Sequence, residues 1–327
     1  MKRSVLGFAF TADALRRFFR VPVDDVLAPF GLSLAHLDPD AGLERSFELK
    51  LLEALLAHVR DPVAGFKLGG RFTLPGYGPF AMLLMSCPNA FEACKVGIHY
   101  QSLAYLFGDL SFDLGPEESA IDLKPWKLPP KVARFIMDRD IAGTLKLMDD
   151  IARLYDQPVT LKTLWMPYPR PEEAAFYESQ VPAPIVWGQD RARLVADTRE
   201  FARTFDRANP VAYRFYKRIC DQLIEAPDEK SAPLSSHILD YLRLFSGQFP
   251  DIRATAHFLD IPERTLRRRL REEGTSFRTL LDTVRRDRAK HLLASGNLTM
   301  DQVARELGYS ETAALYRAMR RWDVSRG

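Results

Sequence analysis

One short pattern occurs twice in the C-terminal part of the chain, and each copy ends in an arginine-bearing helix. The copies align at an offset of 48 residues before a turn and 49 after it. The aligned pairs are Ala256 and Ala304, Leu259 and Leu307, Ile261 and Tyr309, Leu266 and Leu315, Arg268 and Arg317, and Leu270 and Met319. A repeat that preserves apolar positions and one arginine predicts two copies of a helix-turn-helix unit. Because paired recognition helices suit adjacent major grooves of one duplex, we expect this region to read DNA.

The distribution of charge favours the same interpretation. From Leu234 to the end, 17 Lys and Arg side chains stand against 12 Asp and Glu, whereas the preceding residues hold 29 against 31. Sixteen of those 17 cations are arginines, whose guanidinium groups form paired hydrogen bonds with guanine and phosphate. We therefore expect a polyanion to bind at this end of the chain.

The length of 327 residues predicts two domains. The weakest segment is polar and proline-bearing, and it lies within residues 224–234, where we place a linker. Residues 1–223 then form the first domain and residues 235–327 the second.

The first domain is expected to be mixed α+β. Residues 110–114 and 120–123 alternate in polarity around a turn at 115–118, which predicts a hairpin. Residues 159–166 predict a further strand, and residues 185–187 and 193–195 predict another hairpin around 188–190. Since the strands cluster in hairpins, the domain is not doubly wound.

The second domain is expected to be all-α. Gly274 can end a helix, and Ser276 can then cap a long linker helix that runs to Gly296. Eighteen residues at 1.5 Å each give roughly 27 Å, a rod able to hold two motifs about 34 Å apart. Thr299 followed by Gln302 predicts a capping box at the next helix.

Several classes of protein and site are excluded by missing patterns. The three cysteines lack a CxxC or histidine partner, so we expect reduced thiols and no metal. No nucleophile elbow or phosphate loop appears, so we expect neither catalytic residues, nor a cofactor, nor an enzyme. The sequence contains no run of 18 apolar residues, so we expect no membrane-spanning helix. Asp13, Arg16 and Arg17 interrupt the apolar start, so we expect no signal peptide and a cytoplasmic protein.

The segment Pro262–Phe277 resembles the first motif and linker entry of AraC/XylS transcription regulators. Leu307–Ser310, with Arg317, Ala318 and Trp322, resembles their second motif. Upstream residues resemble the AraC-type effector domain of ornithine-utilisation-type regulators, and these are Tyr168–Pro171, Tyr177, Asp190, Leu194, Asn209 and Pro210.

This resemblance implies a sequence-specific transcription regulator whose partner is double-stranded promoter DNA. Residues 1–223 would sense a small-molecule effector or form a homodimer, and RNA polymerase would be a further partner. The resemblance does not identify the effector-binding residues.

Carried over by position, the first recognition helix presents Arg264, Arg267 and Arg268 on one face, with Arg271 beyond them. The second presents Glu311, Thr312, Ala313 and Arg317. A good bidentate contact between arginine and guanine discriminates by about 1–3 kcal/mol. The alternative for the first cluster is a solvated helix face balanced by Glu263, Glu272 and Glu273.

The second motif departs from the family at several points. Ala313 replaces a small polar residue, Leu315 and Met319 replace phenylalanines, and only Asp323–Gly327 follow Trp322. We therefore expect weaker DNA binding there, so that substitution of Arg317 costs less affinity than substitution of Arg268. The alternative function is a ligand-binding or dimerising regulator with an impaired DNA arm that acts through protein partners.

For two further groups of residues the sequence leaves two interpretations open. In the linker helix, Arg285, Arg286 and Arg288 are expected either to pair with Asp282 and Asp287 or to contact phosphate. The stretch Gly76–Met85, rich in aromatic and methionine residues, lines a ligand pocket or belongs to an ordinary core.

Overall fold

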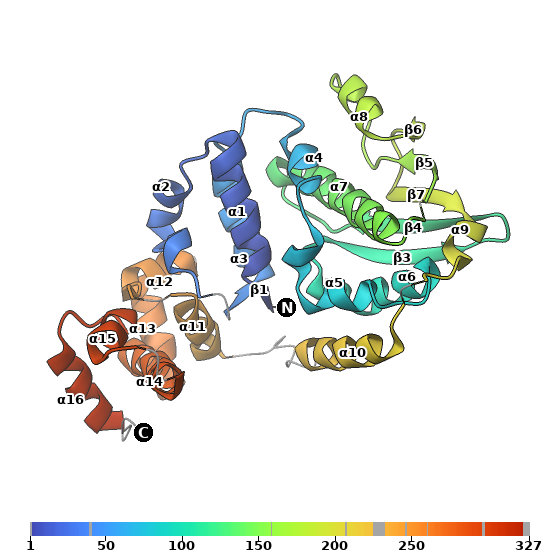
Figure 1. Cartoon of the computed structure of the whole chain (residues 1–327). Coiled ribbons are helices and arrows are strands. Elements are labelled where there is room, and N and C mark those ends of the chain that lie inside the picture. Colours follow the sequence, from blue (N-terminus) through green and yellow to red (C-terminus); the bar gives the residue numbers. More distant parts are fainter. Residues whose placement is uncertain are drawn as a thin grey trace. The chain divides into compact units, whose positions relative to one another are not determined.

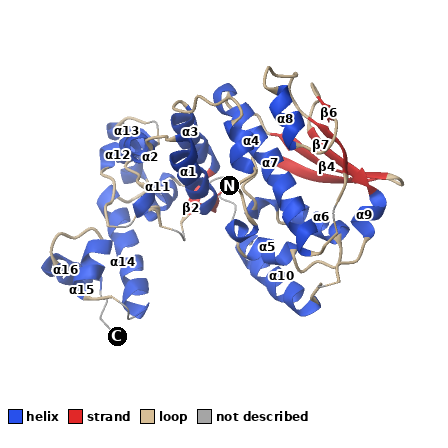
Figure 2. Ribbon diagram, turned by 45° about the horizontal axis from the view of Figure 1, so that its top comes forward, coloured by secondary structure: helices blue, strands red, loops and turns tan. Residues whose placement is uncertain are grey.

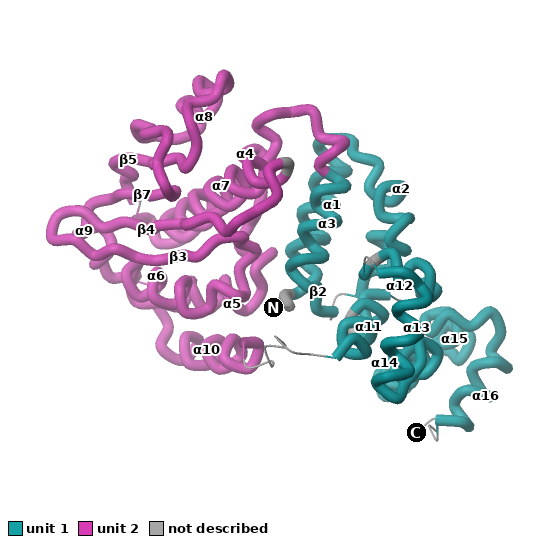
Figure 3. The backbone as a smooth tube through the Cα atoms, turned by 180° about the vertical axis from the view of Figure 1, so that it is seen from behind, with its two compact units in different colours: residues 1–55, 228–327 teal, residues 56–227 magenta. Residues whose placement is uncertain are grey.

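A computed structural model divides the chain into two compact units, coloured separately in Figure 3. Unit 1 joins residues 1–55 to residues 228–327, and unit 2 consists of residues 56–227. The structure describes residues 2–38, 41–157, 159–206, 208–224, 233–245, 247–259, 261–295 and 298–322. Most of the expected linker, residues 225–232, lies outside them.

Unit 2 is mixed α+β, as expected, and its elements are coloured by type in Figure 2. Its helices are α4 (Ala64–Gly69), α5 (Pro79–Leu84), α6 (Ala90–His99), α7 (Pro130–Leu154), α8 (Ala174–Gln180), α9 (Thr198–Ala202) and α10 (Pro210–Ile224). Its strands are β3 (Gly108–Leu114), β4 (Glu118–Pro125), β5 (Leu161–Trp165), β6 (Ile185–Val186) and β7 (Ala192–Asp197), which form one sheet in the order β3-β4-β7-β5-β6.

The first expected hairpin is confirmed and the second is wrong. Strands β3 and β4 pair antiparallel around the turn at 115–118. Strand β6, however, pairs in parallel with β5, while β7 lies between β4 and β5. The turn after β6 does fit a reversal of the chain, since Gly188 has a φ of 76°. Strand β7 has β4 along one edge and β5 along the other, so neither edge is free to pair with β6.

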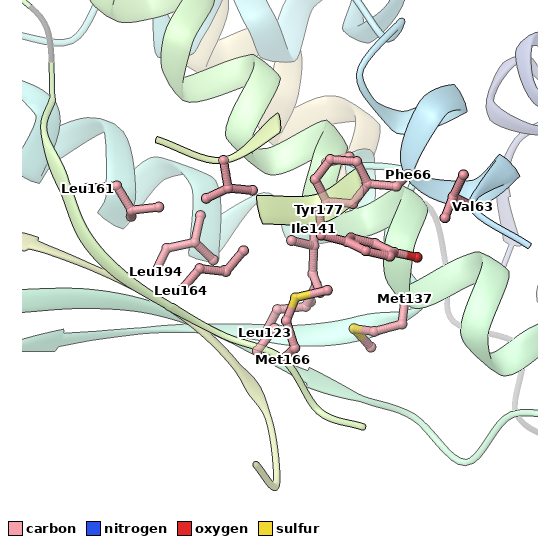
Figure 4. Packing of buried hydrophobic residues seen from close by; sticks show 13 residues of the cluster. Val63, Phe66, Leu123, Met137, Ile141, Leu161, Leu164, Met166, Tyr177 and Leu194 are labelled. Atoms are coloured by element: carbon pink, nitrogen blue, oxygen red, sulfur yellow. The ribbon is translucent and has the colours of Figure 1, made fainter. Parts of the chain in front are cut away.

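Helix α7 packs on the sheet and forms the main core of unit 2 (Figure 4). Met137 and Ile141 of α7 meet Leu123, Leu164 and Leu194 of the strands in one buried cluster. Such burial is the chief source of folding free energy.

Helix α4 approaches α7 closely, and two glycines permit this approach. A Cβ atom on Gly65 would lie 2.2 Å from the carbonyl oxygen of Phe135. A Cβ atom on Gly69 would lie 2.2 Å from that of Arg139. A larger residue at either position would push the two helices apart.

Three of the residues that resemble an effector domain, Tyr168, Tyr177 and Asn209, form structural contacts here. The hydroxyl groups of Tyr168 and Tyr177 both donate to the buried carboxylate of Asp138, the second over 2.6 Å. Arg134 also pairs with Asp138, at 3.1 Å. Asn209 caps α10 by accepting from the backbone N–H of Val211 at 2.9 Å.

Unit 1 begins with an N-terminal segment and ends with six helices (Figure 1). The segment contains β1 (Lys2–Ser4), α1 (Leu6–Phe19), α2 (Val23–Leu27), β2 (Gly42–Glu44) and α3 (Arg45–Leu56), with β1 and β2 antiparallel. The later helices are α11 (Leu234–Arg243), α12 (Ile252–Phe258), α13 (Glu263–Glu272), α14 (Phe277–Ser295), α15 (Met300–Glu306) and α16 (Thr312–Trp322).

The N-terminal segment is bound to the later helices of unit 1, which differs from the expected division at 224–234. The Tyr241 hydroxyl of α11 donates to the Phe30 carbonyl oxygen over 2.6 Å. Arg288 of α14 pairs with Asp38 at 2.9 Å, and Leu37 forms a β-bridge with Phe245. All of these partners lie more than two hundred residues apart in the chain, so no local pattern indicates them.

The long helix is confirmed. Ser276 accepts from the backbone N–H of Thr279 over 3.2 Å at its start, and Gly274 before it has a φ of 69°. Its 19 residues correspond to roughly 28 Å. The end expected at Gly296 lies outside the described residues.

Candidate DNA-binding surface

Helices α12 and α13 form the first helix pair, and buried leucines fix α13. Leu266 and Leu270 are 0% and 1% exposed, in one cluster with Ala256. Asp251 caps α12 by accepting from the Ala254 N–H over 2.8 Å. Since both leucines point into the core, the opposite face of α13 is directed to solvent.

That face carries an exposed stripe of arginines. Arg264, Arg267, Arg268 and Arg271 are all exposed, and their spacing places them on one side of α13. Arg269, also exposed, lies off this stripe because of its position around the helix. The structure thus brings together the four arginines that the sequence indicated. We call them the α13 stripe.

Two arginines of the α13 stripe are paired and two are not. Arg267 lies 2.7 Å from Glu263, and Arg268 lies 2.8 Å from Glu272. Within the described part of the chain, Arg264 and Arg271 form no ion pair. Exposed pairs of this kind contribute roughly 0–1 kcal/mol, so a phosphate or a base can displace the glutamates at little cost.

Helices α15 and α16 form the second helix pair, with a core like that of the first. Leu307 and Leu315 are both 0% exposed, and Met319 is buried with them. The expected capping box is confirmed: Thr299 accepts from the Gln302 N–H, and the Gln302 side chain accepts from the Thr299 N–H. The apolar positions that repeat in the sequence therefore belong to the core of both helix pairs or pack against it.

The four candidate residues of the second pair do not form an equivalent stripe. Glu311, Ala313 and Arg317 are exposed, and Arg317 has no ion pair among the described residues. The Thr312 hydroxyl donates to Asp301 of α15. Thr312 is therefore already hydrogen-bonded within the protein, and Glu311 carries a negative charge that phosphate would repel.

The linker-helix arginines mostly bind partners other than those expected. Arg286 does approach Asp287, at 3.5 Å. Arg285 donates to the Gly308 carbonyl oxygen over 3.2 Å and lies over the Tyr309 ring at 4.6 Å. Arg288 binds the N-terminal segment, as described above. Arg285 and Arg288 thus hold parts of unit 1 together.

One exposed arginine was missed by the sequence interpretation. Arg253 lies in the first turn of α12, with a side chain 84% exposed and 3.6 Å from Glu263. The first helix of a helix-turn-helix crosses the DNA backbone. An arginine at the start of that helix could therefore have been predicted as a candidate phosphate contact. The segment Asp323–Gly327 lies outside the described residues.

The described part of the chain offers no group of side chains that could hold a metal ion. No cluster of three or more His, Cys, Asp or Glu side chains occurs there. Among the same residues, no helix is both long enough and apolar enough to cross a membrane.

Comparison with known proteins gives two family matches. Residues 21–205 match the arabinose-binding domain of AraC transcription regulators, N-terminal, and residues 255–323 match a helix-turn-helix domain. The first match alone covers more than half of the chain.

Relatives match over nearly their whole length. An uncharacterised HTH-type transcriptional regulator of Mycobacterium tuberculosis is 32% identical over 323 residues, covering 92% of this chain and 88% of the relative. The ornithine utilization regulator of Pseudomonas aeruginosa is 23% identical over 326 residues, covering 96% and 95%. The crystal structure of the transcriptional regulator CdpR from Pseudomonas aeruginosa is 23% identical, covers 93% and 94%, and has a TM-score of 0.48.

Proposed function

The chain belongs to the AraC family of transcription regulators, and we propose that it binds promoter DNA sequence-specifically through two helix-turn-helix motifs, under the control of an effector. As a member of this family it is a DNA-binding regulator and not an enzyme. The motifs are the α12–α13 and α15–α16 pairs.

The α13 stripe is the observation that supports this proposal most. Four exposed guanidinium groups on one helix face, anchored from behind by Leu266 and Leu270, suit insertion into a major groove. Arg264 and Arg268 would contact guanine edges, and Arg267 and Arg271 would contact bases or phosphates.

The second motif would bind more weakly. Arg317 would supply its main contact, with Glu311, Thr312 and Ala313 beside it. Helix α14, roughly 28 Å long, is close in length to the spacing of about 34 Å between successive major grooves on one side of a duplex. This similarity supports the binding of both motifs to one duplex.

The effector would be sensed by the N-terminal part. We propose residues 1–223 as the sensing and dimerising part, residues 224–234 as the linker and residues 235–327 as the DNA-binding arm. The match over residues 21–205 supports this grouping, although residues 21–55 pack in unit 1. RNA polymerase and a second copy of the chain are the proposed protein partners, and the cytoplasm is the proposed location.

The test is binding of the full chain to DNA from upstream of its own gene, measured by fluorescence anisotropy. We expect micromolar or tighter affinity that falls about 10³–10⁵-fold between 50 and 200 mM salt, as for proteins with 6–10 phosphate contacts. Arg153→Ala, an exposed arginine of unit 2, is the control and should bind like the wild type. Absence of binding, or affinity unchanged by salt, would contradict the proposal and favour a regulator that acts through protein partners.

A further inference from the structure

Unit 2 contains an apolar cavity, partly open to solvent, between its sheet and its helices. Its volume is about 120 Å³, and it is bounded by α5, α6, β3, β4, α7 and α9. The wall is almost wholly hydrocarbon and includes Phe80, Leu84, Ile98, Leu110, Leu147 and Phe201. The aromatic stretch at 76–85 therefore supplies part of a cavity wall as well as part of the core.

The cavity exists because α6 turns small side chains toward it. Ala90, Ala93 and Gly97 follow one another along one face of α6, and all three line the cavity. A Cβ atom built on Gly97 meets no heavy atom within 4 Å. Burial raises the pKa of the Cys94 thiol, on the same wall, to about 12, because desolvation disfavours the charged thiolate.

Gln157, Glu200 and Arg203 also line the cavity. The Gln157 side chain donates to the Thr204 carbonyl oxygen over 2.8 Å, but its own buried Oε1 atom accepts no hydrogen bond in the described structure. Arg203, the neighbour of Thr204, lines the same cavity, is exposed and has no ion pair among the described residues. Glu200 is nearby, but its Oε2 atom accepts from the Thr160 N–H over 2.7 Å. A buried acceptor without a donor is costly, and a ligand hydroxyl would satisfy it.

This wall does not suit a sugar. A monosaccharide carries hydroxyl groups in every direction, and each loses hydrogen bonds to water unless the protein replaces them. Of the polar side chains on the wall, the Thr144 hydroxyl already donates to the Asp140 carbonyl oxygen over 2.8 Å. A buried site for a sugar would need many more polar partners than this cavity offers.

We propose that this cavity binds a compact aromatic or short aliphatic molecule with a single hydroxyl-type end group, directed to Gln157 and Arg203. An apolar protein cavity of about 150 Å³ accepts benzene, so a volume of about 120 Å³ suits a single ring. The inference rests on the proposed function, because it assigns the effector site that this function requires.

The test is thermal unfolding of the full chain with millimolar phenol, 1-hexanol, toluene or L-arabinose. At a tenfold excess over its Kd, a ligand should raise the Tm of a unit of this size by roughly 3–6 °C. We expect phenol or 1-hexanol to do so and arabinose to have no effect. No shift with phenol and 1-hexanol, or a shift with arabinose alone, would overturn the proposal.

Filling the cavity provides the specific control. Gly97→Leu should fold, because the position is open and helical, and should abolish the shift with phenol. Gly97→Ala adds one methyl group to the same helix and should keep the shift. Equal responses of Gly97→Leu and the wild type would place the ligand elsewhere.

The polar contact is tested separately. Arg203→Gln should weaken the binding of phenol about tenfold, the size of one modest hydrogen bond, and leave the binding of toluene unchanged.

Failure of this site and failure of effector control are separable. If phenol binds in the cavity but leaves the affinity for promoter DNA unchanged, the site stands and control by this ligand fails. If a sugar changes DNA affinity equally in the wild type and Gly97→Leu, effector control stands and the cavity proposal fails.

Discussion

The two helix pairs of unit 1 share a core but differ in the surface that they present. Leu266 and Leu315 occupy equivalent positions, and both are fully buried. On the exposed side, α13 carries the four arginines of the α13 stripe. At the equivalent place the second pair has Glu311 before α16, then Thr312 and Ala313 in its first turn, and it keeps Arg317. Buried positions are constrained by packing in both copies. Exposed positions are free to change, so the two surfaces can have different affinities for DNA.

The pairs also differ in what holds them within unit 1. The first lies against the N-terminal segment, where the Phe30 and His257 ring centroids are 5.9 Å apart. The turn of the second contacts α14, through Arg285 and Gly308. The first pair therefore contacts a residue, Phe30, that lies within the match to the arabinose-binding domain.

The largest expected effects test the shared core. Leu266→Ala and Leu315→Ala should each lower the free energy of unfolding by about 2–5 kcal/mol, because both side chains are fully buried. Calorimetry of the full chain measures this, with the exposed Tyr316→Ala as a control that should change by less than about 0.5 kcal/mol. A cost below about 1 kcal/mol at only one of the two leucines would show that the cores are not equivalent.

The next effect tests the difference between the surfaces. Arg268→Ala should weaken binding to upstream DNA about 5- to 150-fold, corresponding to about 1–3 kcal/mol, and Arg317→Ala should weaken it less. Arg269→Ala removes the same charge from α13 but lies off the α13 stripe, so its effect should be smaller than that of Arg268→Ala. Anisotropy at one fixed salt concentration gives all three values. The reverse order for Arg268 and Arg317 would refute the comparison.

A third prediction concerns the contact between the N-terminal segment and α14. Arg288→Ala removes an ion pair with Asp38 and a hydrogen bond of 2.8 Å to the Phe245 carbonyl oxygen. We expect a loss of about 1.5–3 kcal/mol in the unfolding free energy of unit 1. Arg286→Ala, whose pair with Asp287 is long and exposed, is the matched control. Equal effects of the two substitutions would mean that the segment is not held by Arg288.

The smallest effect compares the helix caps. Asp251→Ala and Thr299→Ala should each cost about 1 kcal/mol, since each removes a hydrogen bond to the first turn of the leading helix of a pair. Thermal unfolding checks both variants. A negligible cost at either position would show that the cap is replaced by water.

The sequence predicted the parts of the molecule that depend on local patterns. The offset between Ala256 and Ala304, the capping box at Thr299 and the arginines of α13 all arise within a few helical turns. The pairing of β6 with β5 and the binding of Asp38 by Arg288 depend on residues distant in the chain. No periodicity indicates such partners, because long-range packing selects them.

The most direct test of the central claim is to replace single guanines of the bound DNA with 7-deazaguanine, which lacks the N7 acceptor in the major groove. Affinities would be measured for the wild type and Arg268→Ala. We predict at least one position at which the replacement weakens the wild type by about 1–3 kcal/mol and adds almost nothing to the loss in Arg268→Ala. Equal losses in both proteins at every guanine, or none in either, would show that Arg268 of α13 does not read bases there.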